Sequence, residues 1–218
     1  MSARGTPTRI AVVDYGAGNL VSIGQALTQV GAEVTVVHDP DGLRAADGLV
    51  VPGVGAAAPA MERLERAGLV EPIRDWIAAD RPFLGICLGL QLLFDGSDED
   101  GAQTLGVLPG RSVRLGDAPT LPHIGWNQVV RSREHPAFRG IADGADLYFV
   151  HSYAGLPSGG LGDDVVLATT EHGRPFVSAV ARGNLVGVQF HPERSGTDGL
   201  RLLANVVAAA AVTARIPV

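Results

Sequence analysis

The sequence contains no lysine, and all 17 of its basic residues are arginines. A chain without lysine cannot form a Schiff base through its own side chains, which excludes pyridoxal-phosphate and aldolase chemistry of that kind. Its single cysteine excludes an internal disulfide and a zinc site built from several cysteines. One free thiol fits a reducing compartment.

The chain also lacks an excess of positive charge, with 23 acidic residues and a net charge of −6. This balance argues against binding to nucleic-acid phosphates or anionic lipid. Long apolar runs are missing too: the four-residue run before Asp14 is too short for a signal peptide, and Asn205 interrupts the Ala-rich segment 200–216. We therefore expect a cytoplasmic protein with no membrane and no nucleic-acid partner.

What the chain does have is apolar sequence, with 46% hydrophobic residues, enough for a substantial core. In the first half, short β-branched runs alternate with segments of helical spacing. This alternation predicts a parallel sheet with helices on its faces. The predicted strands are 9–15, 33–39, 47–53 and 82–87, and the predicted helices are 19–31, 59–81 (broken at Gly68) and 88–94.

The second half reads as short strands followed by a helix from Thr197, with Thr197 or Ser195 as its N-cap. No repeat or linker is visible. We therefore predict one α/β domain over 1–218, with a core of about 9–211: a mostly parallel, flavodoxin-like sheet with an antiparallel extension. The predicted strands are 111–116, 125–131, 145–153 and 164–171, followed by a hairpin over 176–190.

Cys87 lies in the string GICLG, between a predicted strand and a predicted helix. A nucleophile on such a tight turn needs small neighbours two positions away, here Gly85 and Gly89, so that helix and strand can approach. The helix start would favour a thiolate, and the amide of Leu88 could face a developing oxyanion. The string therefore predicts a nucleophile, the alternative being a buried structural cysteine.

A thiol nucleophile needs a base, and the base needs an orienting group. His191 ends a predicted strand and is followed by proline and then Glu193, which can bond the far ring nitrogen. His-Pro-Glu alone also fits an ordinary turn, so the predicted Cys87–His191–Glu193 triad depends on the pairing with the cysteine turn. Two other histidines near strand ends, His123 and His151, stay candidates.

Two glycine-rich segments follow predicted strands. Residues 52–55 (PGVG) would lie at the same sheet edge as Cys87, where glycines let a backbone amide turn toward a substrate. A plain strand-to-helix connection would have the same composition. Residues 16–18 (GAG) resemble the start of a dinucleotide fingerprint, but Val21 stands where its third glycine belongs. A tight turn explains them as well.

GICLGLQ around Cys87 and QFHPERSG around His191 resemble the class I (triad) glutamine amidotransferases. Four further strings are similar to one subfamily, the glutaminase subunits of imidazole glycerol phosphate synthase. The resemblance covers residues 14–196, with Leu90 where the family often has Met and Arg194 where it often has Lys. The four strings are DYGAGNL (14–20), PGVGA (52–56), PHIGWN (122–127) and YFVHSY (148–153).

The resemblance implies roles for individual residues. Cys87 would be the nucleophile, His191 the general base and acid, and Glu193 the group that orients it. The oxyanion would be held by amides of Leu88 and of Gly53–Val54, the latter after a peptide rearrangement. No cofactor or metal is implied. The substrate-binding residues would be Gly55, Gln91, His151, Ser152 and Tyr153.

The implied reaction is hydrolysis of glutamine to glutamate and ammonia. The ammonia would pass to a (β/α)₈-barrel cyclase subunit in a heterodimer, which makes imidazole glycerol phosphate and aminoimidazole carboxamide ribotide in histidine biosynthesis. Activity would be low until the partner binds its ligand. The alternatives are a glutaminase serving pyridoxal phosphate, tryptophan or purine synthesis, a cysteine hydrolase with the same turn, and a non-catalytic subunit.

Overall fold

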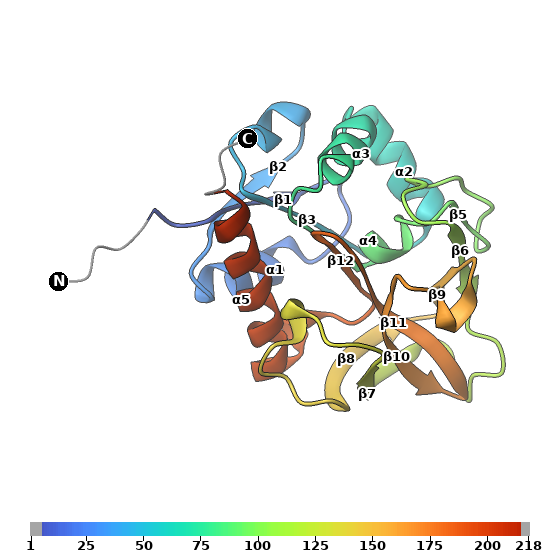
Figure 1. Ribbon diagram of the computed structural model, residues 1–218. Helices are drawn as coiled ribbons and strands as arrows, with labels where there is room; N and C mark the ends of the chain where they lie inside the picture. The colour runs from blue at the N-terminus through green and yellow to red at the C-terminus, as the bar shows by residue number, and fades with distance from the viewer. Residues whose placement is uncertain (1–5, 215–218) are drawn as a thin grey trace.

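A nine-stranded mixed sheet forms the centre of the protein (Figure 1). The computed structural model describes residues 6–214, so both ends of the predicted 1–218 domain lie outside the described residues. The first five strands across the sheet are parallel: β2 (Glu33–Val37), β1 (Arg9–Val13), β3 (Gly48–Gly53), β4 (Phe83–Cys87) and β12 (Leu185–Val188). The remaining four are antiparallel: β11 (Arg174–Arg182), β10 (Val166–His172), β7 (His123–Arg131) and β8 (Ala145–His151).

Helices cover both faces of the parallel half (Figure 1). Two separate apolar clusters fill the space between helices and sheet, one on each face. This arrangement confirms the predicted α/β class and the parallel sheet with an antiparallel extension. On one face lie α1 (Leu20–Gln29) and α5 (Gly196–Thr213), and on the other α2 (Ala57–Arg66), α3 (Val70–Ala78) and α4 (Leu88–Gln91).

Local sequence explains where these elements begin and end. Every residue of β3 and β4 is buried, as expected for central parallel strands that read as continuous apolar runs. Asn19 caps α1, because its side chain accepts a hydrogen bond from the amide of Ser22. The break predicted at Gly68 is present: this glycine has φ +66° and separates α2 from α3.

Two predicted elements end earlier than their apolar patterns suggest. The helix predicted over 88–94 ends at Gln91, because the carbonyls of Leu92, Leu93 and Phe94 accept hydrogen bonds from residues 105–107. The strand predicted over 145–153 is divided at Ser152. Its first part is β8, and its second part begins β9 (Tyr153–Pro157) in another sheet.

That other sheet has three strands and was not predicted. It contains β5 (Gly96–Ser97), β6 (Gly110–Arg114) and β9, and lies beside the antiparallel half of the large sheet (Figure 1). Four short 3₁₀ helices complete the described residues: η1 (Pro40–Leu43), η2 (Pro136–Phe138), η3 (Gly160–Gly162) and η4 (Pro192–Arg194).

Contrary to the prediction, neither Ser195 nor Thr197 caps α5 through its side chain. Ser195 stands at the N-cap position, but its hydroxyl does not cap the helix. Instead it donates to the carbonyl of His191 at 2.7 Å and accepts from the amide of Tyr148 at 2.9 Å. Ser195 therefore fixes the backbone around His191. Among the described helices, none is long and apolar enough to cross a membrane.

Candidate active site

Cys87 sits on a strained turn between β4 and α4, with φ +54° and ψ −107°. A non-glycine residue seldom adopts a positive φ, so the surrounding structure holds it there. Neither flanking glycine could carry a side chain: a Cβ on Gly85 would lie 2.6 Å from the carbonyl oxygen of Gly89, and one on Gly89 would collide with the carbonyl of Val51. The tight turn predicted around the cysteine is present.

His191 and Glu193 form a buried pair at the end of the neighbouring strand. Because β12 pairs with β4 in parallel, the chain leaves both strands at the same sheet edge. His191 Nδ1 donates to Glu193 Oε1 at 2.8 Å, and the two side chains are 7% and 4% exposed. The other ring nitrogen, Nε2, is buried and has no hydrogen-bond partner among the described residues.

The proton affinity of His191 is set by opposing effects. Burial lowers its pKa, but the Cys87 side chain and the Glu193 carboxylate raise it by more, to about 10. At neutral pH the His191 ring therefore holds a second proton. An imidazolium beside the sulfur places a proton where a leaving group would need one.

Gln189 is a neighbour of the sulfur that sequence patterns did not single out. Its side-chain amide points at the Cys87 Sγ at 3.5 Å, while its oxygen accepts a hydrogen bond from Gln91 Nε2 at 3.0 Å. Gln189 is fully buried. The signal was a lone polar residue at the end of an apolar strand, since such a residue needs internal partners.

The glycine-rich segment after β3 borders the cysteine. Gly53 pairs in register with Cys87, Val54 is 47% exposed, and Gly55 has φ +91°. The segment thus leaves the sheet at the predicted place, in a backbone conformation that suits glycine. The amide of Leu88 directly follows the cysteine, at the first position of α4.

Residues 14–18, which follow β1, pack against this glycine-rich segment. Asp14 accepts a hydrogen bond from the amide of Gly16 at 2.7 Å, and Gly18 packs on the Pro52–Gly53 backbone. Residues 15, 16 and 18 form bends, and Gly16 and Gly18 both have a positive φ. The Tyr15 hydroxyl lies so close to Gly53 that a Cβ there would collide with it. That hydroxyl is buried and has no hydrogen-bond partner in the part of the chain that the structure describes. Burial, and to a smaller extent the nearby Cys87, raises the pKa of Tyr15.

A cavity of about 300 Å³ opens beside Cys87, and all five predicted substrate-binding residues line it. Gln91 reaches it from α4 and donates to the carbonyl of Tyr153 at 2.7 Å. Gly53, His191 and Glu193 are not among its lining residues. Predicted residues in the lining are Val54, Gly55, Cys87, Leu88, Gln91, His151, Ser152 and Tyr153, and those not predicted are Ala56, Glu99, Pro122 and Val150.

The histidine in this lining belongs to a chain of neutral rings. His151 Nδ1 donates to the carbonyl of Tyr153 at 2.9 Å, and its Nε2 lies 3.2 Å from His123 Nδ1. Burial lowers the pKa of His151 to about 3 and that of His123 to about 4. Both stay neutral, unlike His191, so the structure favours His191 as the protonated partner of the cysteine. Across residues 6–214, no cluster of three acidic, histidine or cysteine side chains is placed to hold a metal ion.

Comparison with protein families and curated sequences places the chain among known proteins. The model of glutamine amidotransferase class-I matches residues 11–210. The imidazole glycerol phosphate synthase subunit HisH of Symbiobacterium thermophilum is 50% identical over 200 residues, covering 90% of this chain and 92% of that protein. The HisH subunit of Moorella thermoacetica is 50% identical over 197 residues, with the same coverage.

Solved structures of lower identity share the fold. PurLQS from Thermotoga maritima superposes with a TM-score of 0.74 at 19% identity, covering 94% of this chain and 99% of that one. The glutaminase domain of Trypanosoma brucei CTPS, solved with bound acivicin, gives a TM-score of 0.68 at 18% identity and covers 94% of each chain.

Proposed function

This chain belongs to the class-I glutamine amidotransferases, and within them to the HisH subunits of imidazole glycerol phosphate synthase, and from that premise we propose that it hydrolyses glutamine to glutamate and ammonia. The observation that carries the proposal is the strained Cys87 beside a buried, protonated His191 that Glu193 orients. The order of these three groups in the chain and the His191–Glu193 hydrogen bond support roles as nucleophile, base and orienting group.

The reaction would proceed in two halves. The Cys87 thiolate attacks the side-chain amide carbon of glutamine, and the carbonyl electrons move to the oxygen. As the tetrahedral intermediate collapses, the C–N bond breaks, His191 gives its proton to the departing ammonia, and a glutamyl thioester remains. Neutral His191 then takes a proton from water, which attacks the thioester and releases glutamate and the sulfur.

Backbone amides around the cysteine would hold the oxyanion. The Leu88 amide follows the nucleophile, and the Gly53–Val54 segment borders it from β3. We propose that the peptide after Gly53 rearranges when the partner binds its ligand, since glycines lower the cost of such a change. Glutamine would occupy the 300 Å³ cavity, in contact with Gln91 and β9.

Free ammonia is protonated in bulk water, so a glutaminase of this kind needs a partner that receives it. We propose the (β/α)₈-barrel cyclase subunit, in a heterodimer that makes imidazole glycerol phosphate in histidine biosynthesis. We also propose that residues 1–218 form one amidotransferase domain and that the complex is cytoplasmic, where a thiol nucleophile stays reduced.

An exposed apolar patch beside the site suits that partner. Ile124 and Trp126 alternate outward along β7 and are 60% and 56% exposed. Trp126 packs edge-on against Tyr148, and the Arg194 guanidinium lies 4.0 Å above the Tyr148 ring. We name these four residues the β7–β8 patch. Aromatic residues and arginine dominate stable interfaces, and η4, which carries Arg194, directly follows His191.

Replacing the nucleophile tests the chemistry. We expect Cys87→Ser to lower glutamine turnover at least about 100-fold, because an alcohol beside this imidazole is a far weaker nucleophile than a thiolate. Glutamate release, measured with the partner and its ligand present, checks this. Circular dichroism confirms that the variant is folded, and glutamine should protect wild-type Cys87 from iodoacetamide. Undiminished turnover in the folded variant contradicts the assignment.

A further inference from the structure

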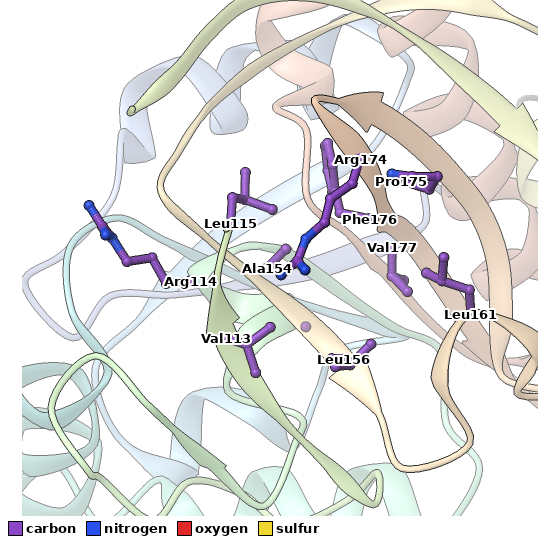
Figure 2. Close-up of a pocket in the computed structure, with 11 residues that line it drawn as sticks. Val113, Arg114, Leu115, Ala154, Leu156, Leu161, Arg174, Pro175, Phe176 and Val177 are labelled. Carbon is purple, nitrogen blue, oxygen red and sulfur yellow. The ribbon is translucent and has the colours of Figure 1, made fainter. Parts of the chain in front are cut away.

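A second cavity, of about 310 Å³, lies between the small sheet and the start of β11 (Figure 2). Its walls are almost entirely apolar, and two leucines at its rim, Leu156 and Leu161, are 40% and 39% exposed. Contiguous exposed apolar surface that surrounds a hollow is typical of a binding site. The remaining apolar lining is Val113, Leu115, Ala154, Gly155, Pro175, Phe176 and Val177.

The side chain of Arg174 extends over this apolar lining. Arg174, at the first position of β11, extends its guanidinium across the hollow toward Leu115 and Ala154, whereas Arg114 points away (Figure 2). The backbone leaves room for this head group, since a Cβ on Gly116 would lie only 3.1 Å from Arg174 Nη2.

Arg174 is also free of internal partners. Over residues 6–214 its guanidinium makes no hydrogen bond and no ion pair, whereas Arg9 and Arg111 bind carboxylates at 2.6–3.2 Å. A planar guanidinium presents a fork of donors that matches a carboxylate. The lining also includes Arg114, but of the two arginines only Arg174 extends its guanidinium over the apolar walls (Figure 2).

We propose that this cavity, which we call the Arg174 cavity, binds a small organic carboxylate with an apolar, ring-sized body. The body would pack against Leu115, Ala154 and Phe176, and the carboxylate would pair with the Arg174 guanidinium in a two-pronged hydrogen bond. Binding needs both burial of the ligand's apolar body and pairing of its carboxylate with Arg174, because an exposed ion pair alone contributes little to affinity.

The Arg174 cavity shares β9 with the candidate substrate cavity. Successive strand residues face opposite sides, so Ala154 and Leu156 line the Arg174 cavity while Tyr153 lines the other. A Cβ on Gly155 would collide with the Phe94 ring, so Phe94 packs directly against the backbone of β9. Phe176, in the Arg174 cavity, also packs at a tilt against His151, with ring centroids 5.0 Å apart. The two cavities are thus separate but structurally adjacent.

Two ligand probes of equal shape test the proposal: 3-phenylpropionate and its neutral amide, 3-phenylpropionamide. Their dissociation constants are measured by NMR titration of the full chain, with a Cys87→Ser version that removes any dependence on glutamine turnover. Arg174→Gln removes the pairing charge, and Arg114→Gln is the matched control, since it removes the same charge from an arginine that points away.

We expect the acid to bind wild type at least about tenfold more tightly than the amide does, as a charged hydrogen bond allows. Arg174→Gln should weaken acid binding about tenfold and leave the amide unchanged, and Arg114→Gln should change neither by more than about twofold. The perturbed resonances should include Ala154 and Phe176. The proposal is overturned by equal binding of acid and amide, by unchanged affinity in Arg174→Gln, or by displacement of the acid by glutamine.

Discussion

The buried Tyr15 hydroxyl packs against Gly53 and has no hydrogen-bond partner within residues 6–214. Leaving such a group unpaired costs free energy of folding, about 1–3 kcal/mol. We expect Tyr15→Phe to raise the free energy of unfolding by about 1 kcal/mol, because the substitution removes the unpaired oxygen and keeps the ring. Urea denaturation measures this. Tyr148→Phe, at a half-buried ring, should change stability by less than about 0.5 kcal/mol, and a lower midpoint for Tyr15→Phe contradicts the prediction.

His191 makes stability depend on pH. Its pKa is raised from 6.5 to about 10, so its contribution to stability is fully present below about pH 6.5 and is lost as the pH rises toward 10. We expect Glu193→Gln to flatten this dependence, because it removes one of the groups that raise the pKa. The free energy of unfolding is measured by denaturation at about pH 7 and about pH 9.5 for wild type and for Glu193→Gln. If it changes with pH equally in both proteins, the result contradicts a His191–Glu193 pair.

Residues near one another in the chain were the ones that sequence could identify. Cys87 with its flanking glycines and His191 with Glu193 are each contained in a few letters, and the structure brings the two strings together. Gln189 was missed because its contact with the sulfur depends on the packing of two distant strands. The unpaired Tyr15 hydroxyl was missed for the same reason, since only a fold reveals which donors lack acceptors.

At the scale of elements, the contact between α4 and β3 depends on the absence of a side chain at position 89. We expect Gly89→Ala to destabilise the fold by at least about 3 kcal/mol or to prevent soluble expression, because its Cβ would overlap the Val51 carbonyl. Gly24→Ala is the matched control. Gly24 lies within α1 with nothing within 4 Å of its Cβ position, so alanine there should stabilise by about 0.5–1 kcal/mol. Guanidinium denaturation compares the two, and equal effects contradict the packing argument.

The strand boundaries show what periodicity cannot decide. Residues 145–153 and the start of β9 form one uninterrupted β-like stretch, yet the chain changes sheets at Ser152. A strand pattern reports which side chains are buried, but not which strand lies beside them. Part of the parallel half was predictable because α1 lies between β1 and β2, and α2 and α3 lie between β3 and β4, which leaves few arrangements. Its fifth strand, β12, instead follows β11 in a hairpin.

At the scale of the whole molecule, the β7–β8 patch is the surface we expect the cyclase subunit to cover. Trp126→Ala should raise the dissociation constant of the heterodimer at least about tenfold, because exposed aromatic anchors dominate such interfaces. Val21→Ser is the control: Val21 is an apolar residue on α1 that is even more exposed, at 70%, and its replacement should change the dissociation constant less than about twofold. Titration calorimetry with the purified partner measures both. If the two variants bind alike, the partner docks elsewhere.

The order of strands in the large sheet also bears on how the chain is made. β4 is complete at Cys87, but β12, which pairs with it, begins only at Leu185. At about 5–20 residues per second, roughly 5–20 seconds of synthesis pass while the open edge of β4 has no native neighbour. Open edges of apolar strands recruit other chains. The late strand that brings His191 to the cysteine therefore also ends the interval in which a nascent chain is most exposed to aggregation.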